Sequence, residues 1–138
     1  MSSAHVFRNG QDLVVADLMS RPVLTVEVGE SLWDAWQLLF VSGLRHLVVL
    51  TSDGTSLGVL SDRNILAEVP ATAEHLSHRR VGDVMAVVPL VSVLPTDSPL
   101  AAARIMVQNM VEAVAVIEPD GRLVGIVTEA DIVRWLVR

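Results

Sequence analysis

The 138-residue sequence contains no cysteine, which excludes disulfide bonds and thiol catalysis and is typical of a protein from a reducing compartment. Aromatic residues make up only 4% of the chain although 51% of it is hydrophobic, so the apolar content is aliphatic. Positive charge is also scarce. The net charge of −6 argues against nucleic-acid binding, which depends mainly on basic residues.

Long apolar runs and catalytic motifs are lacking too. The longest apolar stretch, Val84 to Val91, is far shorter than the roughly 20 residues of a membrane helix, and MSSAHVFRNGQD at the start has no apolar signal core. We therefore expect a soluble, cytoplasmic protein without a membrane partner. No G-x-S-x-G, H-E-x-x-H, Walker or Rossmann glycine motif occurs, so we do not expect an enzyme. Abundant aliphatic residues in a small domain predict an apolar face that self-associates.

Two polar clusters suggest other functions only weakly. His75 and His78, with Glu74, have a spacing that a helical metal site could use, but no further ligand is evident and two histidines in a polar linker are usually solvated. Arg79 and Arg80 form a small basic cluster that could contact phosphate. We predict no metal site and no required cofactor.

The sequence repeats itself. GVLSDRNIL at Gly58–Leu66 returns as GIVTEADIV at Gly125–Val133, and three further blocks recur at offsets of 66 to 68 residues. These further pairs are VADLM and VGDVM, LWDAWQLLF and LAAARIMVQ, and HLVVL and VAVIE. Near-constant offsets across four blocks indicate an internal duplication, and two copies predict a closed pair rather than a solenoid.

Each copy predicts the element order β-α-β-β-α, an α+β (mixed α/β) fold. A first strand (23–28 or 90–94) precedes a helix that starts after Ser31 or Ser98. The apolar stripe of this helix includes Phe40 in the first copy and Leu100, Val107 and Met110 in the second. Two strands (47–50 and 57–60, or 114–117 and 123–127) flank a D-G turn, and a last helix follows. We expect a lead-in and first repeat over 1–69, a linker over 70–80 and a second repeat over 81–138.

These pieces resemble a tandem of CBS domains, the module named after cystathionine β-synthase. The V-x-D-x-M lead-in, the strand–DG–strand hairpin and G-h-h-[S/T]-x-x-[D/N]-h-h, in which h is aliphatic, each occur twice in order, from about Val15 to Leu136. The resemblance implies two repeats packed sheet to sheet with pseudo-twofold symmetry, a homodimer of the tandem (a Bateman-type module), and clefts between the repeats. Such clefts commonly bind AMP, ADP, ATP, S-adenosylmethionine or NADH and regulate a partner protein.

One cleft is predicted to bind ribose through the second repeat. A carboxylate at Asp131 can accept from both ribose hydroxyls, and the Thr128 hydroxyl can bond a ribose or phosphate oxygen. The resemblance completes this site with apolar residues around adenine and basic residues near phosphate: Met19, Leu24, Val26, Leu44, Arg45, His46 and Arg63. Thr128 and Asp131 also match a helix capping box, and solvated arginines are an alternative for Arg45 and Arg63.

The other cleft is predicted to be weaker or retuned. Its ribose residue is Asn64, which lacks the charge of Asp131, and Glu112 would repel phosphate. Its counterparts are Ser61, Asn64, Met85, Val91, Ala113 and Val114. Asn64 could also be a helix-start residue without a ligand.

The sequence leaves three functions open. The first is a stand-alone CBS pair that binds an adenine ligand and signals to an unidentified effector protein. The second is an interaction module that dimerises without a small ligand, and the third, opposed by the net charge, is a nucleic-acid-binding protein.

Overall fold

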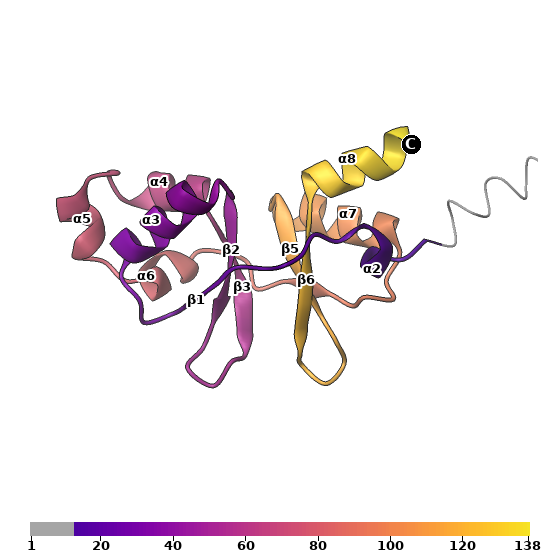
Figure 1. Ribbon diagram of the computed structural model, residues 1–138, viewed down its shortest axis with the longest axis horizontal. Coiled ribbons are helices and arrows are strands. Elements are labelled where there is room, and N and C mark those ends of the chain that lie inside the picture. The colour runs from indigo at the N-terminus through magenta and orange to yellow at the C-terminus, as the bar shows by residue number, and fades with distance from the viewer. Residues whose placement is uncertain (1–12) are drawn as a thin grey trace, which may run out of the picture. The chain divides into compact units, whose positions relative to one another are not determined.

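The computed structural model describes residues 13–138 and divides the chain into two compact units. One unit is Pro22–Val91, and the other combines residues 13–21 with Ser92–Arg138. We call them the 22–91 unit and the 92–138 unit. Each holds one three-stranded sheet with its helices gathered on one side (Figure 1), which confirms the predicted α+β fold.

The 22–91 unit contains most of the first repeat. Its elements are β1 (Thr25–Glu27), α3 (Leu32–Ser42), β2 (His46–Leu50), β3 (Ser56–Ser61), α4 (Asp62–Glu68), α5 (Ala73–Ser77) and α6 (Val81–Met85). Strand β1 runs parallel to β2, and β2 runs antiparallel to β3. The side chains of Leu32, Leu47, Leu60 and Ile65 are fully buried in its core.

The 92–138 unit repeats this plan. It contains α2 (Val15–Leu18), β4 (Ser92–Val93), α7 (Pro99–Asn109), β5 (Ala113–Ile117), β6 (Leu123–Thr128) and α8 (Glu129–Val137). Its sheet has the order β4-β5-β6 with the same parallel and antiparallel pairs. Both hairpins shift register at equivalent points, between Val49 and Leu50 and between Val116 and Ile117, as expected of a duplication.

The predicted helix starts are confirmed. Ser31 Oγ accepts from the Asp34 amide at 3.1 Å, and Ser98 Oγ accepts from the Ala101 amide at 3.0 Å. Helix α3 ends at Gly43, whose φ of 72° is a left-handed conformation that glycine adopts without strain.

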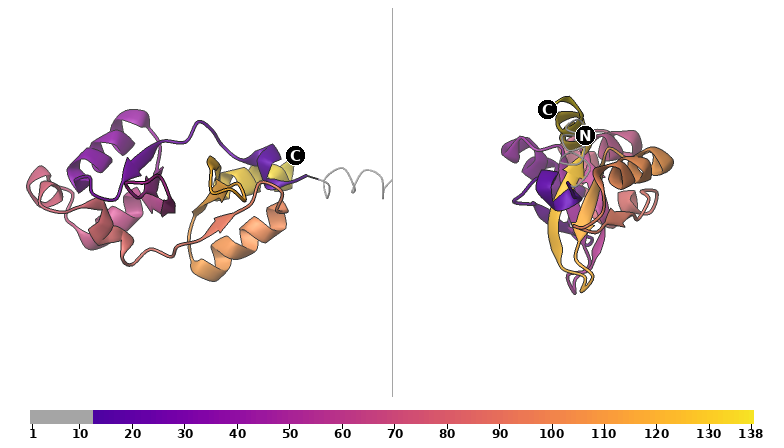
Figure 2. Two further views of the ribbon diagram at one scale, coloured as in Figure 1. Left: turned by 90° about the horizontal axis from the view of Figure 1, so that it is seen from below. Right: turned by 90° about the vertical axis from the view of Figure 1, so that its right-hand side faces the viewer.

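The lead-in helices exchange between the repeats. Helix α2, which precedes the first repeat, packs on α7, α8 and β6 of the second, and α6 packs on α4 and β3 of the first. Figures 1 and 2 both show α2 (indigo) beside α8 (yellow), although more than a hundred residues separate them. Each compact unit therefore contains most of one repeat and the lead-in helix of the other.

The segment predicted as a linker contains helix α5. Thr72 Oγ1 accepts from the His75 amide at 3.2 Å and caps this helix, and Leu76 is fully buried in contact with the core of the 22–91 unit. Residues 70–80 thus contribute packing as well as connection. Among residues 13–138, no helix combines the length and hydropathy that a transmembrane segment needs.

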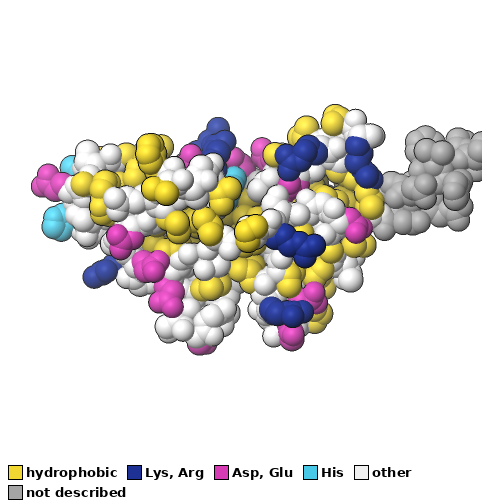
Figure 3. Space-filling view, viewed as in Figure 1, with side chains coloured by type: hydrophobic (Ala, Val, Ile, Leu, Met, Phe, Trp, Pro, Cys, Tyr) yellow, Lys and Arg dark blue, Asp and Glu magenta, His cyan; other side chains and the backbone are white. Residues whose placement is uncertain are grey.

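Four apolar residues are not buried as predicted. Phe40, Leu100, Val107 and Met110 are 84%, 50%, 77% and 92% exposed, so the apolar periodicity placed them wrongly in the core. Helices α3 and α7 are apolar over a wider arc than their sheets cover. Apolar side chains also lie at the surface over α3 and α4 and over α8 in the view of Figure 3.

Candidate ligand site

Asp131 lies where β6 passes into α8. Thr128 ends the strand with extended backbone and is the N-cap of the helix, so Asp131 falls at the third helical position. The Thr128 amide donates to Asp131 Oδ2 at 2.9 Å, and the Asp131 amide donates to Thr128 Oγ1 at 3.3 Å. This pair is the reciprocal capping box that the sequence offered as an alternative.

The Asp131 carboxylate has further donors. The Ser20 hydroxyl donates to Oδ1 and Oδ2 at 3.0 and 3.2 Å, and the Thr128 hydroxyl donates to Oδ2 at 3.2 Å. Arg134 Nη2 donates to Oδ1 as an ion pair. Asp131 is only 2% exposed, and this set of donors compensates the cost of burying its charge.

The 92–138 unit brings Met19 to the same place. A Cβ built on Gly125 in β6 would lie 2.4 Å from Met19 Sδ, so the thioether packs directly on the strand backbone. The next residue, Ser20, pairs with Ile126 through amide–carbonyl bonds of 2.8 and 3.1 Å. Met19, Thr128 and Asp131 therefore all belong to the 92–138 unit and lie on β6 or just beyond its end.

Ser20 and Arg134 were missed by the sequence analysis. Arg134 lies one helical turn after Asp131, and that spacing could have indicated it. Ser20 lies 111 residues before Asp131, so no local spacing connects the two.

The other predicted residues of this site belong to the 22–91 unit. Val26 is buried in β1, and the Leu24 carbonyl accepts from the Val48 amide at 3.0 Å. Leu44 is 45% exposed, and His46 opens β2 opposite Ser61. Their joining with Thr128 and Asp131 in one site stays a prediction.

The two predicted phosphate residues lie near the start of α4. Arg45 Nε lies 3.5 Å from Asp62 Oδ2, so this guanidinium has an acidic neighbour within its own unit. The Arg45 carbonyl also accepts from the Asp62 amide at 3.2 Å. Arg63 follows Asp62 on the exposed side of α4. Any anion at Arg45 would compete with Asp62.

Asn64 occupies the position in the 22–91 unit that Asp131 occupies in the other. Asn64 Oδ1 accepts from the Ser61 amide and hydroxyl, both at 2.8 Å, and the Asn64 amide donates to Ser61 Oγ at 3.1 Å. Met85 lies on Gly58 much as Met19 lies on Gly125, with its Cε 3.4 Å from a Cβ built there. Val91 ends this unit, and Ala113 and Val114 are buried at the start of β5.

Two of the donors around Asp131, Ser20 and Arg134, are not repeated at Asn64. The residue that corresponds to Arg134 is Ala67. The residue that corresponds to Ser20 is Ala86 if the lead-ins are aligned on Met19 and Met85, or Val87 if they are aligned on Pro22 and Pro89. The second lead-in is one residue longer than the first. The C-cap residue of α6, Ala86, keeps helical backbone angles, whereas the C-cap residue of α2, Met19, is extended. The acid and its two partners have therefore changed together.

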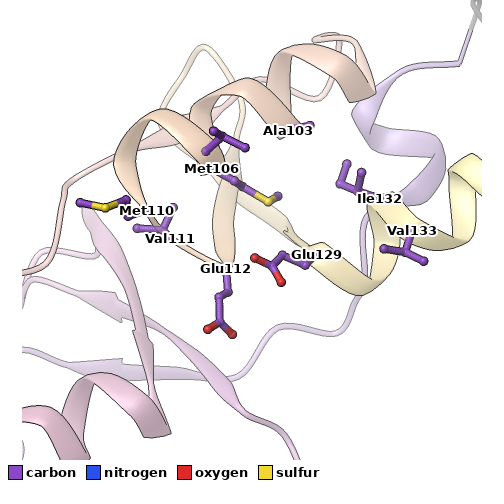
Figure 4. Close-up of a pocket in the computed structure, with 9 residues that line it drawn as sticks. Ala103, Met106, Met110, Val111, Glu112, Glu129, Ile132 and Val133 are labelled. Atoms are coloured by element: carbon purple, nitrogen blue, oxygen red, sulfur yellow. The ribbon is translucent and has the colours of Figure 1, made fainter.

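A groove not foreseen from the sequence lies between α7 and α8. It has a volume of about 440 Å³, with Met106 and Ile132 on its walls and Glu112 and Glu129 at one end (Figure 4). A smaller hollow of about 120 Å³ lies beside Trp36, Phe40 and Asp62 in the other unit. Within residues 13–138, no three His, Cys, Asp or Glu side chains are grouped to hold a metal ion.

The comparisons agree with the duplication. The family model "CBS domain" matches twice, over residues 15–71 and 81–138. The chain therefore belongs to the CBS-domain family and carries two CBS domains in tandem.

Individual relatives differ in architecture. The chain is 31% identical over 88% of its length to a homoserine O-acetyltransferase of Methanococcoides burtonii but spans only 24% of that protein. The structure of CBSX2 in complex with AMP is 27% identical with a TM-score of 0.72, covering 91% of this chain and 96% of that one. A hexameric CBS-CP12 protein from cyanobacteria is 27% identical with a TM-score of 0.77, covering 88% and 66%.

Proposed function

We propose that this CBS pair is a regulatory module that binds an adenine nucleotide or an adenosyl ligand and signals its occupancy to a partner protein. Asp131 and Thr128 hold the ribose. Met19, Leu24 and Val26 contact the base, and Arg45, His46 and Arg63 serve the phosphate side. The module has no catalytic activity of its own.

One observation carries the proposal. The Asp131 carboxylate is buried, yet it accepts bonds from two hydroxyl groups, those of Ser20 and Thr128. A ribose offers the same chemistry, two neighbouring hydroxyl donors, and charge-assisted bonds of this kind are the stronger ones. The AMP complex of CBSX2 shows that a protein with this fold and 27% identity binds such a ligand.

Ligand binding would regulate the partner protein because the ligand has a higher affinity for one arrangement of the module than for another. A ligand shifts a conformational equilibrium only as far as it binds one arrangement better than the other. The homoserine O-acetyltransferase match, in which the chain corresponds to about a quarter of the protein, supports a role beside a catalytic domain. The partner here is a protein whose activity follows the ligand level.

A thermal-shift panel of AMP, ADP, ATP, S-adenosylmethionine, NADH and a short RNA tests this function. A ligand at about 100 times its dissociation constant stabilises the folded state by about 2.7 kcal/mol. We expect a shift with at least one adenine ligand and none with RNA, and we expect Asp131→Ala to abolish it while Asn64→Ala keeps it. A flat panel at millimolar nucleotide would overturn the proposal.

We also propose that the module self-associates through its exposed apolar helices. Val107, Met110 and Val133 flank the α7–α8 groove, and Phe40 and Val41 project from α3, all more than half exposed. Covering such residues with a second copy removes apolar surface from water. The hexameric CBS-CP12 relative is an assembly of chains with this fold. Sedimentation analysis tests this, and a monomer at all concentrations would contradict it.

A further inference from the structure

The α7–α8 groove and the smaller hollow beside α3 occupy equivalent places in the two repeats. If the repeats are aligned on the helix caps Ser31 and Ser98, every residue that lines the hollow corresponds to a residue that lines the groove. The pairs are Trp36 and Ala103, Leu39 and Met106, Phe40 and Val107, Leu44 and Val111, and Asp62 and Glu129. We call the surface that the first members of these pairs form the α3 face.

The groove is open because a small side chain stands where the other repeat has a large one. Trp36 packs against the core of the 22–91 unit, whereas Ala103 leaves the equivalent space of the 92–138 unit unfilled. The hollow accordingly has a volume of about 120 Å³ and the groove one of about 440 Å³. The Phe40 ring, on the edge of the filled hollow, is 84% exposed. One unit therefore presents a projecting aromatic ring, and the other presents an apolar groove.

The charges at these two surfaces differ in the same sense. Glu112 and Glu129 lie at one end of the groove (Figure 4), and none of the nine described residues that line it is basic. A second groove placed over the first would add further carboxylates without a base to compensate them, which is costly in a desolvated contact. In the other repeat the residue that corresponds to Glu112 is Arg45, whose Nε lies 3.5 Å from Asp62 Oδ2. The α3 face therefore adds no net negative charge when it covers the groove.

We propose that the α7–α8 groove receives the α3 face of a second copy of this chain, with the Phe40 ring inserted beside Ala103. This inference rests on the proposed self-association and specifies which surfaces meet. The contact is heterologous, because it joins different surfaces of the two copies. It removes the Phe40 ring and the groove residues Val107 and Met110 from water, and an aromatic side chain that fills a pocket is a common anchor of protein interfaces.

Sedimentation equilibrium of Ala103→Trp, Phe40→Ala and an equimolar mixture of the two tests the inference. Ala103→Trp fills the groove with the side chain that the other repeat carries at this position, and Phe40→Ala removes the inserted ring. We expect each variant alone to associate about tenfold more weakly than the wild-type chain. The mixture should associate more tightly than either variant alone, because the Phe40 ring of one variant meets the open groove of the other.

Two further variants keep the test clean. Val87→Ala shortens an apolar residue that is 65% exposed outside both surfaces, so it should associate like the wild-type chain. Urea unfolding checks that Ala103→Trp is folded. Val107→Asp, at an exposed position of the groove, replaces Ala103→Trp in the mixture if the tryptophan unfolds the chain.

The outcomes separate this inference from the proposals on which it rests. If only the groove variant weakens association, the groove meets a second groove, and if only Phe40→Ala weakens it, α3 meets a second α3. Either result, or a mixture that associates no more tightly than its components, overturns this inference and leaves self-association standing. A wild-type chain that is monomeric at all concentrations overturns both. These measurements contain no nucleotide, so none of their outcomes bears on the adenine-ligand site.

Discussion

The two units use the same backbone plan at the start of their last helix but different chemistry. At Thr128–Asp131 a buried carboxylate accepts bonds from a threonine, from the serine of the exchanged lead-in and from an arginine. At Ser61–Asn64 a neutral amide oxygen accepts from the serine of its own capping box. The capping box is therefore common to both units, and the donors Ser20 and Arg134 distinguish the 92–138 unit from the 22–91 unit.

The difference also explains how a charge can be buried in one repeat. An isolated carboxylate inside a protein is costly unless hydrogen bonds or a counter-charge compensate it. Asp131 has both, whereas Ala67 and Ala86 could supply neither to an acid at position 64. Duplication thus kept the fold while the two sites diverged.

Asp131→Ala should cause the largest loss of stability. It leaves the donors from Ser20, Thr128 and Arg134 without their acceptor, so we expect the free energy of unfolding to fall by about 2–3 kcal/mol. Asn64→Ala removes only capping bonds and should cost about 1 kcal/mol. Urea unfolding of both variants checks this, and equal losses would contradict the difference between the units.

Gly125→Ala should weaken the packing of the lead-in helix α2 on β6. The new Cβ would lie 2.4 Å from Met19 Sδ and 2.9 Å from its Cγ, so the whole side chain must move. We expect a loss of about 1–3 kcal/mol and faster hydrogen exchange of the α2 amides.

Gly29→Ala is the control for this variant. A Cβ at Gly29 has no atom within 4 Å, so its effect should stay within about 0.5 kcal/mol. If Gly125→Ala leaves α2 as protected as Gly29→Ala does, Met19 does not hold the lead-in.

A charge in the α7–α8 groove should weaken self-association more than one on α3. The groove holds about 440 Å³ and the hollow beside α3 about 120 Å³, so in the proposed assembly a second copy would cover more apolar surface at the groove. We expect Val107→Asp to weaken association about tenfold, near 1.4 kcal/mol, and Val41→Asp to weaken it less. Sedimentation equilibrium measures both, and the reverse order would assign the main contact to α3.

The smallest expected effect is a lowered pKa of Asp53 in the hairpin turn of the 22–91 unit. The Thr51 hydroxyl and the Thr55 amide bond the Asp53 carboxylate and lower its pKa from the ordinary 3.8. A lowered pKa stabilises the fold at pH values above 3.8, and this contribution is lost as the pH falls through the lower folded-state value. NMR titration should place the Asp53 midpoint below 3.8, and a midpoint at or above it would contradict the turn contacts.

Local signals predicted much of the fold. The serine caps at Ser31 and Ser98, the Asp-Gly turns and the short aliphatic strands act over a few residues, and each is present in the structure. Local signals could not predict the exchange of the lead-in helices, because the contact of Met19 with Gly125 joins distant segments. Only the family resemblance placed Met19 with Asp131.

The candidate site, too, was predictable only where local sequence patterns define it. Thr128 and Asp131 follow from the repeated motif, and Arg134 could have been found by helical spacing. Ser20 depends on the exchanged α2 segment, which no local pattern reveals. Phe40 and Met110 were misplaced because apolar periodicity identifies an apolar face without telling whether its own sheet or another chain covers it.

Calorimetric titration of the adenine ligand that gives the largest thermal shift, into the wild-type chain, Asp131→Ala and Asn64→Ala, tests the central claim most directly. The account predicts saturable binding that is lost in Asp131→Ala and retained in Asn64→Ala. Binding of that ligand that survives in Asp131→Ala, or that is lost only in Asn64→Ala, would contradict it.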